Sequence, residues 1–358
     1  MPVNVKKIKK QLSPVKKKTP APDRISTGST LLNLAVSGNP DEAFSKGQFI
    51  LFVGDSQAGK SWLALQIMAE ASCSRTFDQH ELIHDNPERG TLMDIARYYG
   101  IKLANRIRPP SPSGPSRFLE EFYDHVDDAV KAGKPFVYVL DSEDALKSEQ
   151  EWKKSAVNKS IRRGTRKGEI KGDYGDGKAK KNSSGLRMAH NDVADTGSLL
   201  IMIKQTRDNI GIDAEYNPKT RSGGRALTFY ASCEVWFSVK GKIRKSIRGK
   251  NRVIGTILRI HVKKNRVAGR DRTVDLHFYP TVGIDDTGSC VGFLVEEAHW
   301  KETKGKLIAP EFDFMGSQED LVKKIEAEGW ENDLKKIVAG VWTDIESACT
   351  VERKNRYG

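Results

Sequence analysis

The stretch GDSQAGKS, at residues 54–61, has residue types and spacing that bind phosphate. It follows the apolar run FILFV and precedes WLALQIMAEA, an order that predicts a strand, a glycine-rich turn and a helix. The pattern G-x-x-x-x-G-K-[ST] lets backbone N–H groups turn toward phosphate oxygens, and the helix N-terminus adds partial positive charge. We therefore expect a nucleoside triphosphate to bind at Gly54, Asp55, Ser56, Gln57, Ala58, Gly59, Lys60, Ser61 and Trp62.

Three side chains have predicted roles at this site. Lys60 is expected to reach the β- and γ-phosphates, and the Ser61 hydroxyl is expected to coordinate Mg²⁺. Asp141 ends the apolar run FVYVLD, where a carboxylate holds Mg²⁺ directly or through water. An aspartate in such a place can also be a helix N-cap. Its occurrence together with the phosphate loop, however, favours a role for Asp141 as a metal ligand.

Hydrolysis also needs a carboxylate that orients the attacking water. The segment HELIHDNPERG offers Glu88, with Asp85 as the second candidate. A surface charge or a helix-start residue is the alternative for either of them. The residues alone leave the choice open.

The elements that must position these groups follow from hydropathy. Near-continuous apolar strands alternate with helices, which predicts an α/β fold with a mainly parallel central sheet. Gly54, Asp141 and Gln205 each follow such a strand, and ligands bind at the carboxyl ends of parallel strands. The expected strands are residues 47–54, 80–86, 134–142 and 198–205, and the expected helices are 25–38, 61–72, 91–100 and 118–133.

The C-terminal part of the chain changes pattern. Alternating segments predict antiparallel strands, and helical periodicity returns after about residue 310. We expect a small helical C-terminal domain at 306–358, after a core at 25–305 and a flexible basic tail at 1–24. The expected strands are 233–239, 255–264 and 273–280, and the expected helices are 317–329, 332–340 and 344–354.

The charge of the chain indicates a polyanionic partner. The 358 residues carry a net charge of +13, with seven Lys and no acid in residues 1–18. Residues 147–187 carry nine Lys and four Arg against five acids. We expect the basicity to be confined to these two segments, as cationic arms on a neutral body. Solvated, disordered runs are the alternative.

Other function classes lack support in the sequence. No apolar run approaches the roughly 18–20 residues of a membrane span, and no secretory signal is present, so an intracellular, soluble protein is expected. The four cysteines show no metal-binding spacing and are expected to be reduced, packed thiols. The glycine- and lysine-rich residues 164–185 hold almost no apolar side chains and predict a mobile loop. A second glycine-containing loop is expected at 210–224.

Five motifs in order resemble the RecA family of ATP-dependent homologous recombinases over residues 25–300. ISTGSTLLNLAVSG resembles the segment before the phosphate loop, and GDSQAGKS and FVYVLDS match the two nucleotide motifs. MIKQTRDNIG with RSGGRALTFYASCEVWF resembles a strand, a DNA-binding loop and a helix. HVKKNRVAG resembles a lysine-bearing segment at the subunit interface. The resemblance implies a P-loop NTPase core that binds ATP and Mg²⁺.

The resemblance also implies roles for single residues. Glu88 is then the water-activating glutamate, although its neighbours Pro87 and Arg89 are unusual and leave Asp85 open. Gln205 senses the γ-phosphate and relays its presence to the following loop, with a strand-end polar residue as the alternative. Lys264 and Arg266 reach the nucleotide of a neighbouring subunit. Phe229 matches a subunit-contact position, and a core aromatic is an equally good interpretation.

Two DNA-binding loops are implied, within residues 148–187 and 207–224. The first is longer and more basic than in bacterial RecA, and Trp152 and Tyr174 are its few aromatic residues. Such a segment predicts strong, salt-sensitive, sequence-independent binding. The expected DNA-binding residues are Arg162, Arg163, Lys180, Lys181, Arg187, Arg207, Lys219, Arg221, Gly223, Gly224 and Arg225.

The expected function is therefore a DNA-dependent ATPase that forms a helical filament on single-stranded DNA. It would pair that strand with homologous duplex DNA and exchange strands in recombination and repair. The altered ends suit a protein encoded by a phage or mobile element. A RecA-like regulator or mediator that binds DNA without exchanging strands is one alternative. A ring-forming motor of the same fold is the other.

Overall fold

The structure of the chain is a computed structural model. It describes residues 23–90, 93–165, 167–169, 177–208, 219–221, 224–303 and 305–353. Most of the predicted basic tail, 1–24, therefore lies outside the described residues. So does most of the second predicted DNA-binding loop, including Gly223.

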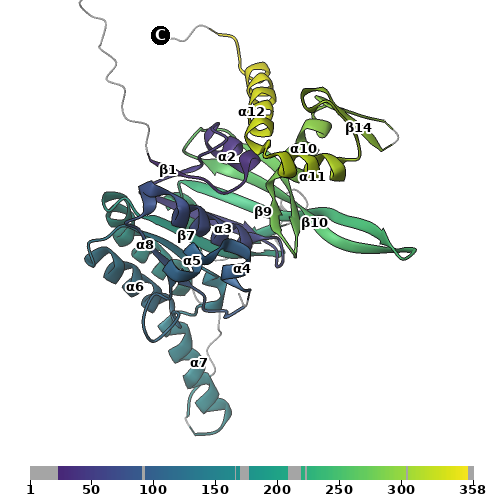
Figure 1. Cartoon of the computed structure of the whole chain (residues 1–358). Helices are drawn as coiled ribbons and strands as arrows, with labels where there is room; N and C mark the ends of the chain where they lie inside the picture. The colour runs from purple at the N-terminus through teal and green to yellow at the C-terminus, as the bar shows by residue number, and fades with distance from the viewer. Residues whose placement is uncertain are drawn as a thin grey trace, which may run out of the picture.

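The described core is an α/β fold built on one large mixed sheet (Figure 1). The strand order is β12-β11-β10-β9-β3-β7-β6-β4-β5, and β8 pairs with β7 outside this path. Strands β9, β3, β7, β6, β4 and β5 run parallel, and β9 to β12 pair in antiparallel fashion, so the predicted fold class is confirmed. The parallel strands are β3 (Gln48–Gly54), β4 (Glu81–Asp85), β5 (Ile107–Arg108), β6 (Phe136–Leu140) and β7 (Leu199–Asp208).

Strand β3 lies between two hydrophobic cores, which explains its continuous apolar sequence. Ile50 and Phe52 face the core that also holds helices α2 and α3. Leu51 and Val53 face the other core, formed with helices α6 and α8. Alternate side chains of a strand point to opposite faces, so both faces of a covered sheet need apolar residues. These helices are α2 (Thr30–Ser37), α3 (Lys60–Cys73), α6 (Leu119–Lys131) and α8 (Gly177–Asp195).

Short elements complete the core. Ser29 caps α2 by accepting a hydrogen bond from the Leu32 N–H, and Gly38 ends the helix at φ 76°. The left-handed conformation there favours glycine. The remaining elements are β1 (Arg24–Ile25), β2 (Phe44–Ser45), η1 (Arg75–Phe77), α4 (Ile95–Tyr99), α5 (Ile101–Arg106), η2 (Glu143–Ala145), β8 (Lys219–Arg221), α9 (Arg225–Tyr230), β11 (Arg272–Tyr279), β12 (Gly283–Asp285) and α10 (Asp286–Glu296).

The first predicted DNA-binding loop is largely helical, so the mobile-loop prediction is wrong for residues 177–185. Helix α7 (Glu149–Arg162) projects from the body, and α8 begins at Gly177 (Figure 1). Ser148 and Glu151 form a reciprocal capping box that starts α7. Helix α8 is held by Asn182, which is buried and accepts a hydrogen bond from the Tyr123 hydroxyl at 2.9 Å. Polar contacts therefore hold the first part of α8, and Leu186 and Val193 bury its later part in the second hydrophobic core.

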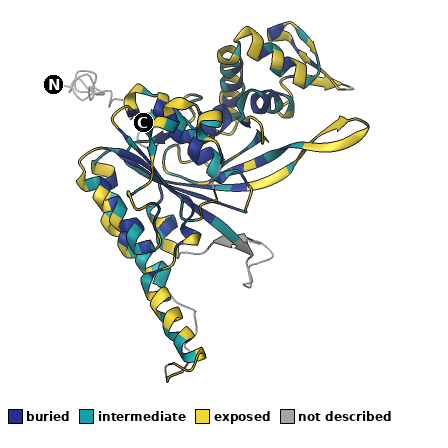
Figure 2. Cartoon of the chain, turned by 60° about the horizontal axis from the view of Figure 1, so that its bottom comes forward, coloured by how far each residue is buried: buried dark blue, intermediate teal, exposed yellow. Residues whose placement is uncertain are grey.

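Strands β9 (Cys233–Ile247) and β10 (Lys250–Asn265) form a hairpin that is much longer than predicted. Its far end leaves the body and is exposed (Figure 2). Residues 240–252 hold seven Lys and Arg and no acid, so the prediction that the basicity is confined to two segments is wrong. The near-neutral net charge outside those segments concealed this cluster because acidic residues elsewhere cancel it in the sum.

The C-terminal part holds the predicted helices, α11 (Gln318–Glu328) and α12 (Glu331–Ala348). One helix, α12, spans most of the two segments predicted separately after residue 331. A small antiparallel sheet that we did not predict precedes them. Its strands are β13 (Lys301–Thr303), β14 (Lys306–Ala309) and, after η3 (Pro310–Phe312), β15 (Phe314–Gly316).

The C-terminal helices share a hydrophobic core with the ATPase-like body. Trp342 and Val338 of α12 and Ile325 of α11 belong to the same buried cluster as α2 and α3. Within the described ranges, no helix has the length and apolar character of a membrane span. All four cysteines are free thiols, as predicted, but Cys73 and Cys349 are exposed rather than packed.

Candidate nucleotide-binding site

The phosphate-binding loop joins β3 to α3, as the sequence predicts, and two of its glycines are required by geometry. A Cβ on Gly54 would lie 2.4 Å from the Phe237 carbonyl oxygen. Gly59 has φ 85°, and a Cβ there would lie 2.5 Å from Leu258 Cδ1. No side chain fits at either place, so the backbone itself forms the cradle. The first N–H groups of α3 have no partners within the helix and are available to an anion.

Lys60 is buried at the start of α3 and folds back over the loop. Its Nζ donates to the carbonyl oxygens of Gly54 at 2.8 Å and Asp55 at 2.6 Å. Burial lowers the pKa of Lys60, and the nearby carboxylate of Asp141 opposes that shift. A bound phosphate would give this ammonium a charged acceptor in place of two carbonyls.

A cavity of about 280 Å³ lies beside the loop. Lys60, Ser61, Glu88 and Asp141 all line it. Asp141 is buried, with 6% of its surface exposed. The hydroxyl of Ser61 and the carboxylate of Asp141 are oxygen ligands of the kind that Mg²⁺ prefers, with phosphate and water completing its shell. The described residues hold no cluster of three or more His, Cys, Asp or Glu that could bind a metal unaided.

Trp62 also lines this cavity, and its ring belongs to an aromatic cluster. Its centroid lies 5.0 Å from that of Tyr98 and 5.1 Å from that of Phe278, both in edge-on geometry. The Tyr99 hydroxyl donates to the Trp62 carbonyl oxygen at 3.1 Å. The cluster anchors the first turn of α3 against neighbouring elements.

Glu88 connects the cavity to strand β7. Its Oε1 accepts hydrogen bonds from Gln205 Nε2 at 3.2 Å and from the Ser142 hydroxyl. Gln205 lies near the end of β7, directly before the segment that leads to residues 207–224. The next residue, Thr206, donates its hydroxyl to Asp55 of the phosphate loop. Strand β7 therefore contacts both Glu88, which lines the cavity, and the phosphate loop.

Asp85, the second candidate for the water-activating carboxylate, has structural partners instead. It is fully buried at the end of β4. Its carboxylate accepts the Ser116 N–H at 2.9 Å and the Tyr138 hydroxyl at 2.8 Å, together with the Ser116 hydroxyl. Asp85 is not among the residues that line the nucleotide cavity, whereas Glu88 is.

A buried ionic network next to Gln205 was not foreseen. Lys204 is fully buried and pairs with Glu143, also fully buried, and with Asp144 at 2.9 Å. Asp144 also accepts the Gln205 N–H at 2.7 Å, and Lys178 of α8 lies 3.6 Å from Glu143. The network joins η2, β7 and α8. The only sequence signal is the run of polar residues after the apolar strand, DSED.

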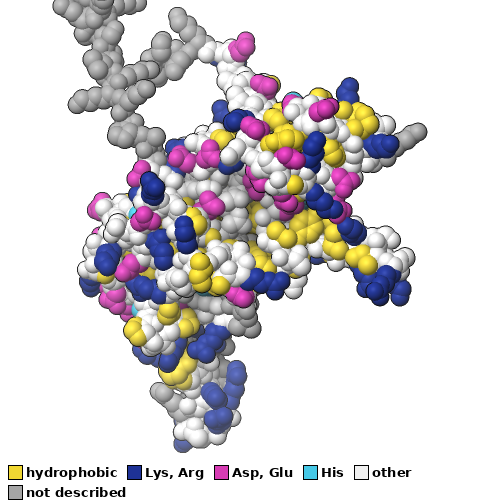
Figure 3. Space-filling model, in the orientation of Figure 1, with side chains coloured by type: hydrophobic (Ala, Val, Ile, Leu, Met, Phe, Trp, Pro, Cys, Tyr) yellow, Lys and Arg dark blue, Asp and Glu magenta, His cyan; other side chains and the backbone are white. Residues whose placement is uncertain are grey.

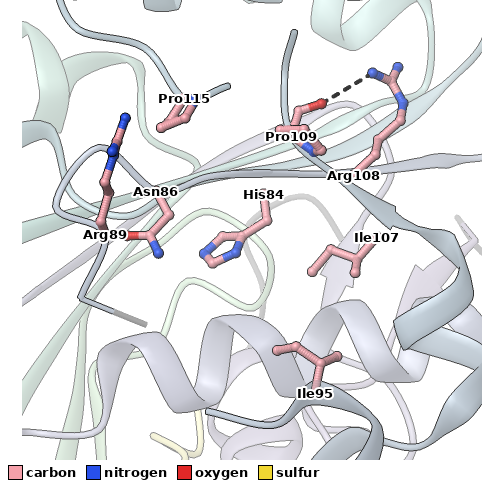
Figure 4. Close-up of a pocket in the computed structure, with 8 residues that line it drawn as sticks. All are labelled: His84, Asn86, Arg89, Ile95, Ile107, Arg108, Pro109 and Pro115. Carbon is pink, nitrogen blue, oxygen red and sulfur yellow. Dashed lines mark hydrogen bonds between the residues drawn. The ribbon is translucent and has the colours of Figure 1, made fainter. Parts of the chain in front are cut away.

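A second cavity, of about 360 Å³, is also lined by residues of the loop 86–90 (Figure 4). Asn86 lines both cavities, and His84 and Arg89 line only the second. His84 Nε2 lies 3.9 Å from an Asp141 carboxylate oxygen, and within the described part of the chain it has no hydrogen-bond partner. The loop that carries Glu88 therefore contributes lining residues to both cavities.

Lys264 and Arg266 lie away from this chain's own nucleotide cavity. The Lys264 ammonium donates to the Thr228 and Phe229 carbonyl oxygens, and Arg266 donates to the Phe229 carbonyl at 3.2 Å. They thus hold the C-terminal end of α9. Burial and the neighbouring Arg266 charge lower the pKa of Lys264. The Phe229 side chain is 67% exposed beside them, so the interpretation as a core aromatic is wrong.

The predicted DNA-binding residues occupy several elements. Arg162 and Arg163 are exposed at the end of α7, and Lys180 and Arg187 are exposed on α8. Lys181 is half-buried on α8. Gly224 (φ 78°) and the exposed Arg225 begin α9. The side chains of Arg207, Lys219 and Arg221 lie outside the described residues, although the β7–β8 backbone pairing is described.

Comparison with known proteins agrees with this geometry. The family model described as RecA N-terminal domain matches residues 8–285. Protein RecA of Caulobacter sp. (strain K31) is 27% identical over 321 residues, which cover 85% of this chain and 80% of that protein. Protein RecA of Rhizobium etli is 30% identical over 282 residues, which cover 75% of this chain and 66% of that protein. The chain, with its phosphate loop, sheet order and matched length, belongs to the RecA family.

Proposed function

We propose that this protein is a DNA-dependent ATPase and recombinase. It assembles on single-stranded DNA as a helical filament and exchanges strands with homologous duplex DNA. The observation that carries the proposal is the hydrogen bond between Gln205 and Glu88, which links the nucleotide cavity to the strand leading into the second DNA-binding loop. The name of the similar proteins, Protein RecA, supports the same activity.

In this proposal ATP and Mg²⁺ occupy the cavity beside the phosphate loop. Lys60 turns from the loop carbonyls to the β- and γ-phosphates, and Ser61 and Asp141 hold the metal. The metal neutralises charge on the phosphates and orients them. Glu88 accepts a proton from the attacking water, and the Ser142 hydroxyl holds its carboxylate in place.

The γ-phosphate would compete for the Gln205 amide, which now donates to Glu88. Because Gln205 lies at the end of β7, any change in its contacts reaches the segment that follows. A ligand shifts an equilibrium only by the difference in its affinity for two states. ATP, which has the γ-phosphate, is therefore expected to favour the DNA-binding state more strongly than ADP does.

Lys264 and Arg266 serve a neighbouring subunit in this proposal. They lie beside the exposed Phe229 and outside their own chain's nucleotide cavity. In a filament the next copy would bring its cavity to this surface, so that each ATP lies between two protomers. A repeated head-to-tail contact of this kind produces an open helical assembly.

Two alternatives use the same core. A RecA-like regulator or mediator would bind DNA without exchanging strands, and a ring-forming motor would close its subunits into discrete rings. A homologous strand-exchange assay with ATP tests the proposal, since only the recombinase transfers a labelled strand from duplex to a single-stranded circle. Lys60→Ala is the control, and it must abolish the exchange. Strand transfer that is absent in the natural protein, or unchanged in Lys60→Ala, refutes the proposal.

A further inference from the structure

The outer part of the β9–β10 hairpin, residues 242–255, is a free two-stranded ribbon. Strand β3 pairs with β9 only up to Phe237, and β11 pairs with β10 only up to Thr256. Beyond these positions the two strands pair only with each other in the described structure, from Lys242 opposite Thr256 to Ile247 opposite Lys250. Six residues of strand extend about 20 Å. The ribbon projects from the body in Figures 1 and 2.

The ribbon is strongly cationic on both strands. It holds six Lys and Arg and no acid, and dark blue side chains gather at its tip in Figure 3. Lys245 pairs with the carboxylate of Glu319 at 2.8 Å. For the others, the described part of the chain provides no ion pair. These exposed residues are Lys242, Arg244, Arg248, Lys250 and Arg252.

Two features of the ribbon are unfavourable in the isolated chain. Lys245 lies directly opposite Arg252, and like charges in such a pair weaken a hairpin. The turn places Arg248 at φ 53° and Gly249 at φ 72°. This pattern of two positive φ values favours Asn or Asp at the first place, yet an arginine occupies it. A polyanion against the ribbon would relieve the repulsion and pair with the arginine at the tip.

We propose that this ribbon binds duplex DNA by entering a groove. A two-stranded ribbon fits the major groove, whose phosphates flank both of its edges. Single-stranded DNA is a weaker candidate because its binding proteins stack bases on aromatic side chains, and residues 242–255 contain none. A second copy of this chain is the remaining candidate, and the sedimentation measurement below distinguishes it from duplex DNA.

This inference rests on the proposed function, in which a homologous duplex is a substrate, and it adds a surface for that duplex. The ribbon is separate from α7 and α8, and it lies at a different end of the molecule from α7 (Figure 1). The protein could therefore hold a duplex with residues that take no part in binding the nucleotide.

The test compares two variants with equal loss of charge. The ribbon variant carries Lys242→Gln, Arg244→Gln and Lys250→Gln, all at exposed positions. The control variant carries Lys102→Gln, Lys134→Gln and Lys301→Gln, which are exposed elsewhere on the surface. Fluorescence anisotropy of the full-length proteins with a labelled duplex, and with its single strand, is measured over a series of salt concentrations.

We expect the ribbon variant to lose duplex affinity and to flatten the slope of log K against log salt by about 2.7, since each phosphate contact contributes about 0.9. The control variant is expected to change the slope by much less, and ATP affinity should be equal in all three proteins. Equal slopes in both variants overturn the inference. The inference is also overturned if the ribbon variant keeps its duplex slope but sediments differently from the natural protein without DNA. That result would mean that the ribbon contacts another copy of the chain.

Strand exchange by the natural protein separates the two proposals. If the ribbon governs duplex binding but no strand exchange occurs, the surface stands and the recombinase proposal fails. If strand exchange occurs and the ribbon variant matches the control in duplex binding, only the ribbon inference fails.

Discussion

Glu88 and Asp85 lie three residues apart, and their surroundings give them different chemistry. Asp85 is enclosed by three hydrogen-bond donors at the end of β4. Glu88 lines the nucleotide cavity and shares its Oε1 with Ser142 and Gln205. A carboxylate must reach the substrate to act as a base, so the position favours Glu88.

Glu88→Gln is expected to lower the kcat of ATP hydrolysis by about 10²–10⁴-fold, because the amide cannot accept the proton from water. Nucleotide affinity should be nearly unchanged, since Lys60 and the loop are intact. Steady-state hydrolysis and equilibrium binding of a fluorescent ATP analogue measure the two quantities. A variant with normal kcat would show that another group activates the water.

Asp85→Asn is the matched control for that experiment. We expect it to lower the free energy of unfolding, because a buried amide cannot accept all three hydrogen bonds that the carboxylate accepts, at a cost of about 1–3 kcal/mol. Chemical denaturation measures this change. A selective loss of kcat at full stability would instead place Asp85 in the chemistry.

Lys204 tests the buried network beside Gln205. Lys204→Met removes the nearest cation from the buried Glu143 and leaves it with Lys178 at 3.6 Å. Removing one member of a buried pair costs about 3–5 kcal/mol. The double variant Lys204→Met, Glu143→Gln removes both charges and should recover much of the lost stability. Urea denaturation of the three proteins decides the point: no recovery in the double variant would mean that Lys204 contributes through packing rather than through charge.

At the scale of elements, helix α7 forms a projecting arm within the segment that the sequence predicts to bind DNA (Figure 1). Neutralising Lys153, Lys154, Lys159, Arg162 and Arg163 to Gln should flatten the salt dependence of single-stranded DNA binding and leave ATP affinity unchanged. Anisotropy titrations at several salt concentrations measure the slope. An unchanged slope would reduce α7 to a solvated helix without a DNA contact.

The parallel strands were predictable because their residues are apolar on both faces, as β3 and β6 illustrate. The polar groups that follow these strands could be placed at one edge of the sheet because parallel strands share their carboxyl edge. Helix α8 and the outer hairpin were not predictable. Polar contacts of Asn182 hold the first part of α8, and its buried apolar residues begin only at Leu186. The ribbon alternates charged residues with few apolar ones, so neither segment shows a hydrophobic period where it begins.

At the scale of the whole molecule, the proposed function has the nucleotide cavity of each chain completed by Lys264 and Arg266 of a neighbouring copy. Lys264→Ala and Glu88→Gln should each be nearly inactive alone. Mixed in equal amounts, they should recover about a quarter of the natural ATPase activity, because random assembly pairs an intact Glu88 with an intact Lys264 at that share of head-to-tail interfaces. ATPase assays of the mixture measure the recovery. Additive residual rates would mean that each chain hydrolyses ATP by itself.

The fold brings a nucleotide switch, a helical arm and a cationic ribbon together on one sheet. Strand β7 carries Gln205, and β9 leads from the sheet that also holds the phosphate loop into the ribbon. The ribbon thus continues directly from a strand that pairs with β3, the strand that leads into the phosphate loop. In the proposed function, this arrangement lets ATP control the affinity of the protein for DNA.

Electron microscopy of the protein on single-stranded DNA with a slowly hydrolysed ATP analogue tests the central claim most directly. We predict regular helical filaments that form with the analogue and are absent both without nucleotide and in the Lys60→Ala variant. Discrete closed rings, or DNA binding without any regular assembly, would contradict the account.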